Sequence, residues 1–391
     1  LYYAQRHGDL YFSSELASLC HHPAIDYDID IKSLVSYFAH GYVPAPDSMI
    51  SGIQKLPAGH SLIYNLTESS IRLERYWRFE LAPQMDWVAR PQALSEALIE
   101  RLYAAVSTRM QADVPVGVFL SGGIDSSSVA SLAMTASKSQ NIKTYSIGFE
   151  DKSFDETAYS SDMATVLGTD HTNERLTTEG CLGLLDDIYT HLDEPMADGS
   201  LAPSFLMCRL ARTEVTVALG GDGADELFAG YDPFKALRPA HFYSRVVPKF
   251  IHGAISNLTG KIPVSHRNMS LDFKLKKFLS GLGYESRIRN PIWLGTLPPG
   301  HLSRLFGKPV DPQIVYSQAI AAWEASGAEN DIDRTLQFYV EMYLQNNILT
   351  KMDRAGMLNS LEVRSPFLDI DLVNLVRTIP SELKFNGRET K

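Results

Sequence analysis

The chain has few cysteines, no long apolar run and no excess of positive charge. Its three cysteines, Cys20, Cys181 and Cys208, are odd in number and widely spaced among 391 residues. This pattern fits neither a disulfide framework nor a zinc site and predicts a reducing, cytoplasmic location. No stretch approaches about 18 consecutive apolar residues, so no membrane span is predicted. A formal net charge of −10 argues against a general nucleic-acid binder. We therefore expect small-molecule partners, with no nucleic acid and no membrane among them.

The commoner phosphate-binding loop is absent as well. No glycine is followed, after four residues, by Gly-Lys and then Ser or Thr, which excludes a kinase or GTPase of that type. A different glycine turn is present at residues 118–128, where Val-Phe-Leu runs into Ser-Gly-Gly-Ile-Asp and then three serines. The preceding residues, 114–120, are largely apolar, as in a strand that is buried on both faces.

This turn has the composition of an anion site. Gly122 and Gly123 lack Cβ, so the backbone can bend sharply and approach an anion closely. The serines from Ser126 onward open a helix, whose free N–H groups and positive dipole end face the turn. Asp125 would repel a phosphate unless a cation lay between them, so we interpret it as a Mg²⁺ ligand. The motif resembles the pyrophosphate loop of enzymes that split ATP between its α- and β-phosphates. A plain strand-to-helix turn is the alternative.

From residue 114 onward, strand-like and helix-like segments alternate. The expected strands are 114–120, 143–149, 171–176 and 215–219, and the expected helices are 126–137, 155–168, 178–191 and 199–213. This order predicts an α/β fold with a doubly wound parallel sheet. Ligands of such sheets bind beyond the carboxyl ends of the strands.

Composition divides the chain into three stretches. Residues 1–82 alternate short β-like runs with turns and are interpreted as the later part of a β-rich domain. Residues 83–91 hold two prolines and little apolar periodicity, which is typical of a linker. Residues 92–391 form the predicted α/β domain with helical additions, and the chain is expected to be helical throughout from about residue 330.

A second glycine-rich loop follows the expected strand at 215–219. Residues 220–231 read Gly-Gly-Asp-Gly-Ala-Asp-Glu-Leu-Phe-Ala-Gly-Tyr. So flexible and acidic a stretch is poor local structure, and such violations tend to mark functional sites. We predict Asp225 as a second Mg²⁺ ligand that shares the cation with Asp125, and we place Asp222 near the reacting carbonyl. A plain acidic turn is the alternative.

Several stretches of the chain together resemble one enzyme family. They are Leu1-Tyr-Tyr, Phe12-Ser-Ser-Glu-Leu, His40-Gly-Tyr-Val-Pro, Leu56-Pro-Ala-Gly-His, the Ser121 loop, Asp193-Glu-Pro, the Gly220 loop, Lys351-Met-Asp-Arg and Glu362-Val-Arg-Ser-Pro-Phe-Leu-Asp. In this order and spacing, the chain resembles a glutamine-dependent asparagine synthetase of the bacterial B type. The resemblance implies an ATP-pyrophosphatase fold for residues 92–391, truncated at its end, after part of an N-terminal-nucleophile glutaminase domain.

The resemblance also implies a reaction. ATP, with Mg²⁺, would activate the side-chain carboxylate of aspartate as β-aspartyl-AMP and release pyrophosphate. Ammonia, made from glutamine in the full-length protein, would then displace AMP to give asparagine. The implied catalytic residues are Asp222 and Lys391, of which Lys391 would steady the α-phosphate unless it is simply a solvated terminal lysine. The implied nucleotide-binding residues are Phe119, Leu120, Ser121, Gly122, Gly123, Asp125, Ser126, Ile147, Gly220 and Gly221.

Four further charged residues belong to the matching motifs in the expected helical part. They are Lys351, Asp353, Arg354 and Glu362. Two interpretations are open for them: they orient the amino-acid substrate, or they form a buried ion network under the site. Two positions depart from the family pattern. Asp222 replaces a Glu that many relatives have, which leaves its acid-base role open, and Gly220 replaces a frequent Ser but keeps the backbone donor.

Family members make ammonia at an amino-terminal cysteine, and no cysteine of this chain fits that position. We therefore expect a fragment that lacks this residue and uses free ammonia but not glutamine. Two other interpretations stay open. One is a relative that adenylates a different carboxylate, such as a β-lactam synthetase or an amidotransferase of secondary metabolism or glycan modification. The other is a module that binds ATP without turnover. The sequence also leaves a homodimer open.

Overall fold

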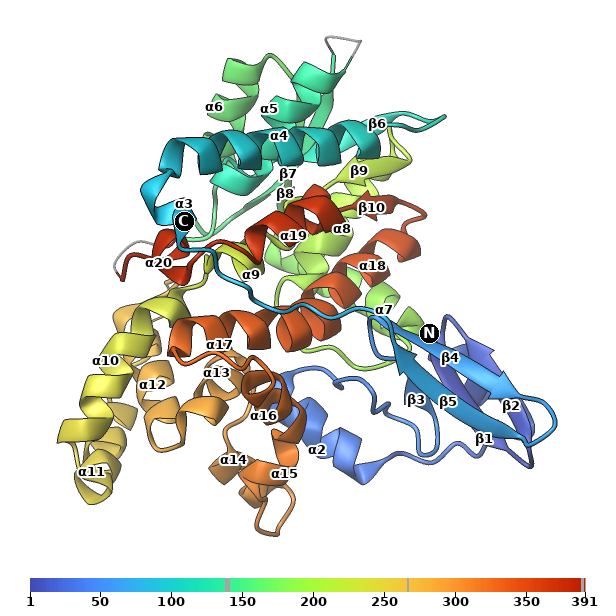
Figure 1. Ribbon diagram of the computed structural model, residues 1–391, viewed down its shortest axis with the longest axis vertical. Helices are drawn as coiled ribbons and strands as arrows, with labels where there is room; N and C mark the ends of the chain where they lie inside the picture. Colours follow the sequence, from blue (N-terminus) through green and yellow to red (C-terminus); the bar gives the residue numbers. More distant parts are fainter. Residues whose placement is uncertain (138–140, 266, 388–389, 391) are drawn as a thin grey trace.

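The computed structural model describes residues 1–137, 141–265, 267–387 and 390. The chain folds into a β-rich region at the amino terminus, a parallel α/β region and a layer of helices (Figure 1). In Figure 1 the α/β region lies at the top, the helical layer at the lower left and the β-rich region at the lower right.

The β-rich region contains a three-stranded antiparallel sheet in the order β2-β1-β3 and an antiparallel β4-β5 hairpin. The strands are β1 (Tyr2–Arg6), β2 (Asp9–Ser13), β3 (Gln54–Lys55), β4 (His60–Asn65) and β5 (Ser70–Arg75). Tyr2 and Ala4 share a small core with Leu16 and Leu19 of α1 (Leu16–Cys20). The β-like runs expected in this region are confirmed, whereas β3, with two residues, is too short to show a period of two in the sequence.

Helix α2 (Ile31–His40) joins the β-rich region to the helical layer and was not expected from the sequence. The Asp30 side chain caps it by accepting a hydrogen bond from the Ser33 amide at 2.7 Å. Val35 and Ala39, four residues apart on one face, are buried in the core of the helical layer. The α2 helix therefore packs outside the region in which it begins.

The central sheet has five parallel strands in the order β10-β9-β6-β7-β8. They are β6 (Val116–Phe119), β7 (Lys143–Phe149), β8 (Asp170–Leu176), β9 (Val217–Leu219) and β10 (Glu362–Arg364). The predicted α/β class, its parallel sheet and its four expected strands are confirmed. The chain builds the sheet outward from β6 to β8 and then returns to place β9 on the other side of β6.

Strand β10 corrects the expectation that the chain is helical from residue 330 onward. The helix before it ends where the Leu361 amide donates to the Gly356 carbonyl at 2.9 Å and Ser360 adopts a φ of +55°. The next residues pair with β9, and the Gly220 amide continues this pairing by donating to the Arg364 carbonyl at 2.9 Å. Glu362 thus begins an edge strand of three residues, which is too short to leave a pattern in the sequence.

Helices cover both faces of this sheet, as the doubly wound prediction requires (Figure 1). One face carries α4 (Pro91–Arg109), α5 (Ile124–Ala136) and α6 (Thr157–Leu167), and the other carries α7 (Thr178–His191), α8 (Leu201–Arg212) and α18 (Leu349–Leu358). Successive side chains of β6 point to opposite faces, so Val118 packs in the first core and Phe119 in the second.

The remaining helices belong to the helical layer, form short connections or, at residues 370–376, pack against α4 in the first core of the sheet. They are α3 (Asp86–Ala89), α9 (Ala224–Phe228), α10 (Asp232–Val246), α11 (Lys249–Gly260), α12 (Leu271–Leu282), α13 (Ser286–Leu294), α14 (Pro299–Leu305), α15 (Pro312–Val315), α16 (Ser317–Glu324), α17 (Asp331–Phe338), η1 (Tyr339–Ile348), η2 (Pro366–Leu368), α19 (Ile370–Val376) and α20 (Ser381–Lys384). The η1 segment is a π-helix that runs directly into α18. Within the described part of the chain, no helix has both the length and the apolarity needed to cross a bilayer.

Candidate active site

Strands β6 and β9 are neighbours at the point where the order of the sheet reverses. Ligands of open α/β sheets bind in the crevice at such a switch point, outside the carboxyl ends of the strands. The loops that follow the two strands, at 120–126 and 220–225, both line one cavity of about 440 Å³. Sheet order therefore joins two glycine loops that are about a hundred residues apart in sequence.

The first loop is held together by the hydroxyl of Ser126. This hydroxyl accepts a hydrogen bond from the Ser121 amide at 3.1 Å, lies 2.9 Å from the Ser121 hydroxyl and donates to the Gly123 carbonyl at 3.2 Å. Gly122 has a φ of +81°, and a Cβ at this position would lie 2.6 Å from the backbone of Tyr159. The loop is therefore a tight turn that leads to the amino terminus of α5, where backbone N–H groups favour an anion.

Most of the residues predicted to bind a nucleotide lie around this cavity. The eight that line it are Phe119, Leu120, Ser121, Asp125, Ser126, Ile147, Gly220 and Gly221. Gly122 and Gly123 shape the turn, and they are not part of the lining. Apolar side chains at the ends of β6 and β7 thus lie in the same cavity as the serine and glycine loops, an arrangement with room for both an aromatic base and an anionic tail.

The second loop touches the first. A Cβ built on Gly221 would lie 3.2 Å from the Cβ of Asp125, so a side chain at this position would push the two loops slightly apart. Asp222, Gly223, Asp225 and Glu226 also line the cavity. The acidic stretch is therefore part of the cavity wall rather than a solvated turn.

The carboxylates of this cavity fit a magnesium ion that is shared with a bound phosphate. Asp125 and Asp225, the two predicted ligands, line the same cavity from different loops. In the residues that the structure describes, no group of three or more His, Cys, Asp or Glu side chains is arranged to hold a metal by itself. Mg²⁺ commonly takes one or two carboxylates and completes its shell with water and substrate phosphates. The donor set therefore suits Mg²⁺ that arrives with a nucleotide.

Burial changes the acidity of two carboxyl groups in the second loop. Burial raises the pKa of Asp222, an effect that the nearby Lys351 ammonium opposes and the Asp225 carboxylate adds to. Burial also raises the pKa of Glu226 to about 7, although the Tyr231 hydroxyl donates to Glu226 at 2.6 Å and favours the charged form. No role for Glu226 or Tyr231 was expected from the sequence, in which only their place in the acidic loop marked them.

Lys351 on α18 also lies in the cavity wall. Its side chain is buried, and its ammonium donates to the Ser200 hydroxyl at 2.7 Å and lies 3.7 Å from the Asp198 carboxylate. The Asp198 carboxylate accepts a hydrogen bond from the side-chain amide of Asn347 at 2.9 Å. Burial would raise the pKa of Asp198, but Lys351, Ser200 and Asn347 together lower it. The sequence analysis did not single out Asp198 or Ser200, and their polar Asp-Gly-Ser run was the available signal.

Of the four charged residues for which substrate binding was left open, Lys351 lines this cavity, whereas Asp353, Arg354 and Glu362 lie outside its lining. The Arg354 guanidinium is 3.6 Å from the Asp193 carboxylate and 3.8 Å from that of Glu15. Asp353 is exposed, and Glu362 pairs with Arg364 at 2.8 Å in the edge strand. The structure therefore places these residues in surface and interface ion pairs, and their substrate-binding role stays a prediction. Lys391, the other predicted catalytic residue, lies outside the described residues.

These features define a parallel α/β protein in which the Ser121 loop, the acidic Gly220 loop and the buried Lys351 meet at the switch point of the sheet. Comparison with protein families agrees with this class. The family model described as "Asparagine synthase" matches residues 97–391, and that described as "Glutamine amidotransferase domain" matches residues 1–77. The chain therefore belongs to the asparagine synthase family.

The chain is also similar to named proteins. It is 29% identical to "Asparagine synthetase [glutamine-hydrolyzing] 1" of Bacillus subtilis (strain 168), over 100% of this chain and 60% of the relative. It is 31% identical to "Putative asparagine synthetase [glutamine-hydrolyzing]" of Mycobacterium tuberculosis (strain ATCC 25618 / H37Rv), over 94% and 55%. It is 27% identical to "Amidase chry2" of Gibberella zeae, over 88% and 54%. The chain thus spans 54 to 60% of the length of these curated relatives.

Proposed function

We propose that the chain carries the ATP-dependent half of an asparagine synthetase and part of the glutaminase half. The proposal rests on one observation: the Ser121 and Gly220 loops, with Asp125 and Asp225, line one cavity at the switch point of the sheet. The proposed reaction joins the side-chain carboxylate of aspartate to the α-phosphorus of ATP, with loss of pyrophosphate. Ammonia then attacks the acyl carbon, and the bond to AMP breaks to give asparagine.

The residues of the first loop would act by positioning. Backbone donors of the Ser121 loop and the amino terminus of α5 would hold the pyrophosphate end of ATP, and Phe119, Leu120 and Ile147 would contact the adenine. Asp125 and Asp225 would hold Mg²⁺, which when bound neutralises charge on the departing pyrophosphate. Holding ATP and carboxylate in line supplies most of the acceleration expected for such a transfer.

Asp222 is the proposed proton acceptor of the second step. Ammonia carries an extra proton once its nitrogen has bonded to the acyl carbon, and that proton must leave for the amide to form. A carboxylate whose pKa is raised by burial is a better base than an exposed one at neutral pH. The shorter reach of Asp, compared with the Glu of many relatives, requires the acyl carbon to lie close to the Gly220 loop.

In the complete protein we propose that glutamine supplies the ammonia, because residues 1–77 match the glutamine amidotransferase domain. Cys20, Cys181 and Cys208 are free thiols, which supports the predicted cytoplasmic location. A homodimer stays a prediction.

A different acceptor acid is the second candidate, and the similarity to relatives named amidases favours it. Exchange of labelled pyrophosphate into ATP, run with aspartate and with a panel of other carboxylic acids, separates the two candidates. Exchange that depends on aspartate, with AMP release once ammonia is added, supports the first. Exchange with another acid alone supports the second. ATP binding with no exchange for any acid would refute both and leave a non-catalytic ATP-binding module.

A further inference from the structure

The cavity at the switch point has a marked imbalance of charge. Among the described residues that line it, the acids are Asp125, Glu156, Asp222, Asp225 and Glu226. In that same described lining the cationic side chain is Lys351 alone. The anionic substrates proposed for this cavity need a positively charged partner, and the buried Lys351 ammonium can supply it.

The environment of Lys351 fixes where its ammonium lies. Lys351 is 7% exposed, and one of the three N–H donors of its ammonium goes to the Ser200 hydroxyl at 2.7 Å. The Asp198 carboxylate, at 3.7 Å, is beyond hydrogen-bond distance and is itself held by Asn347 and by the Ser200 amide and hydroxyl, at 2.6 to 2.9 Å. Asp198 therefore balances the charge of the ammonium while Ser200 orients it.

Lys351 approaches the cavity from the opposite face of the sheet to the phosphate loop. Helix α18 packs in the core that contains Phe119 and Phe205, whereas α5, whose amino terminus faces the proposed pyrophosphate site, packs in the core that contains Val118. Lys351 therefore lines the cavity from a different side than the amino terminus of α5, and we expect it to bind a different anion. In the proposed reaction the other anionic reactant is the acceptor amino acid.

We propose that Lys351, oriented by Ser200, binds the α-carboxylate of the acceptor amino acid. Asp222 lines the same cavity and keeps its proposed place beside the reacting carbonyl. Binding of the α-carboxylate by the Lys351 ammonium leaves the side-chain carboxylate of aspartate to point toward the α-phosphorus. This inference rests on the proposed function and names the specificity determinant of its acceptor site.

The test compares two acceptors in two enzymes. β-Alanine is aspartate without its α-carboxylate, so it keeps the reacting carboxylate and loses the group that Lys351 would bind. In the complete protein, Lys351→Met is expected to raise the KM for aspartate about 10- to 100-fold, as for loss of a charge-assisted hydrogen bond. The KM for ATP should change less than about threefold, since α5 and the Ser121 loop are intact. For β-alanine, the wild type and Lys351→Met should have similar kcat/KM values.

Two further variants show whether a change in KM comes from misfolding or from the loss of the Lys351 ammonium. Lys277→Met removes another partly buried lysine, which donates to the Gly295 carbonyl at 2.6 Å in the helical layer, and should leave both KM values unchanged. Ser200→Ala keeps the Lys351 charge and should raise the KM for aspartate by a smaller factor. If Lys351→Met does not fold, the result for Ser200→Ala with aspartate and β-alanine decides the question alone.

The outcomes separate this inference from the proposed function. A rise in the KM for ATP with no change for aspartate would assign Lys351 to a phosphate and overturn the inference. If Lys351→Met lowers kcat/KM equally for aspartate and β-alanine, Lys351 acts in the chemical step or in folding, and the inference is overturned. If the unaltered complete enzyme shows no aspartate-dependent exchange of pyrophosphate into ATP, the proposed function is wrong, and the inference that rests on it is wrong too.

Discussion

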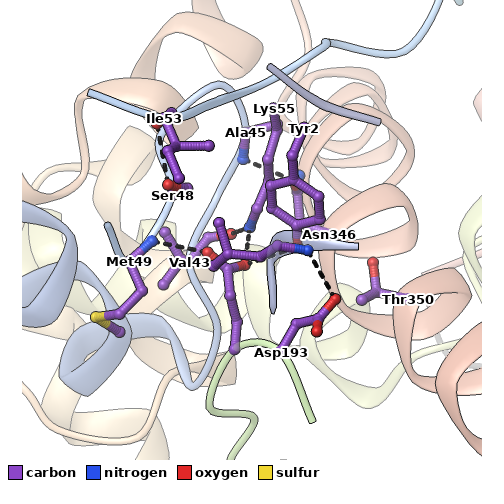
Figure 2. A network of polar contacts seen from close by, with 12 residues as sticks. Tyr2, Val43, Ala45, Ser48, Met49, Ile53, Lys55, Asp193, Asn346 and Thr350 are labelled. Carbon is purple, nitrogen blue, oxygen red and sulfur yellow. Dashed lines mark hydrogen bonds and ion pairs between the residues drawn. The ribbon is translucent and has the colours of Figure 1, made fainter. Parts of the chain in front are cut away.

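Glu194 and Lys55 form a largely buried ion pair, with side chains 11% and 18% exposed, between the α/β region and the β-rich region. The Glu194 carboxylate also accepts from the Met49 amide at 2.7 Å and from the Tyr2 hydroxyl at 3.3 Å. The Lys55 ammonium donates to the Val43 carbonyl at 2.6 Å (Figure 2). A carboxylate from one region is therefore enclosed by polar groups of the other, which fixes how the two regions meet.

The segment that carries Glu194 reaches both the interface and the cavity. Asp193 accepts from the Leu16 amide at 2.9 Å in the β-rich region, and five residues later Asp198 begins the support of Lys351. Helix α18 also reaches both places: its Lys351 lies in the cavity wall, and its Arg354 pairs with Asp193 at the interface with the β-rich region. Two elements thus link the packing of the β-rich region to the lysine of the cavity.

Removing one member of the Lys55–Glu194 pair should destabilise the protein strongly. Glu194→Gln leaves a largely buried ammonium without its counter-charge, and we expect it to cost about 2–4 kcal/mol of unfolding free energy, below the cost for a fully buried pair. Urea unfolding followed by fluorescence measures this loss. The control is Glu74→Gln, which breaks an exposed pair with Arg72 and should change stability by less than about 1 kcal/mol. Equal effects of the two variants would contradict the assignment of Glu194 as a buried anchor.

Replacing either predicted metal ligand should abolish pyrophosphate exchange. Asp125→Asn and Asp225→Asn each remove a negative ligand, and we expect a loss on the order of 100-fold or more, because metal neutralisation of a leaving group is worth several kcal/mol. The measurement is exchange against Mg²⁺ concentration. The exposed Asp113→Asn is the matched control and should behave as wild type. Full activity of both cavity variants would remove the metal site from the proposal.

Asp222→Asn should separate the two steps of the reaction. If Asp222 accepts a proton only in the ammonia step, amide formation should fall about 10²- to 10⁴-fold, while pyrophosphate exchange changes by less than about tenfold. Parallel assays of exchange and of amide product measure the difference. Asp222→Glu, which restores a carboxyl group, should recover part of the amide-forming rate. Loss of exchange equal to the loss of amide would show that Asp222 acts before ammonia arrives.

Glu226 should make stability depend on pH. Its folded-state pKa of about 7 lies above the ordinary value of 4.5, so the folded state holds its proton more tightly. The stability that this group contributes is complete below pH 4.5 and is lost as the pH rises to 7. A shift of this size corresponds to about 3 kcal/mol.

Glu226→Gln should therefore flatten the fall in stability between pH 4.5 and 7 and be more stable than wild type at pH 8. The amide oxygen of Gln can still accept from Tyr231, so that hydrogen bond is kept. The midpoints of urea unfolding, measured for the wild type and Glu226→Gln at a series of pH values, compare their stabilities. Parallel profiles for the two proteins would show that Glu226 titrates near its ordinary value.

Gly122→Ala should disrupt the anion-binding turn. The substitution places a Cβ 2.6 Å from the Tyr159 backbone and also strains a residue whose φ is +81°. Gly168→Ala is the matched control, because its φ is +70° but nothing lies within 4 Å of the added Cβ. Both variants should lose about 1 kcal/mol from backbone strain. Gly122→Ala should lose more than this, and should also weaken ATP binding in calorimetry, whereas the control should bind ATP normally.

Much of the fold follows from local pattern. The strands β6 to β9 and the helices between them were predicted within a few residues, because each is long enough to show its apolar period or is bounded by glycine. The two glycine loops were found for the same reason, since a strand that leads into Gly-Gly is visible in the sequence. The short strands β3 and β10 were missed because, unlike the three apolar residues of β9 before Gly220, they have neither an apolar run nor a glycine directly after them.

The amino-acid order alone determined which groups are available: a loop that can turn tightly around an anion, two aspartates and an acidic stretch after a buried strand. Only the tertiary structure decided which of them meet. The order β10-β9-β6-β7-β8 puts β9 beside β6, and packing of α18 against α8 turns Lys351 into the cavity while Asp353 faces solvent. Residues far apart in the chain come together through strand pairing and helix packing, and the local pattern of a sequence does not record these long-range contacts.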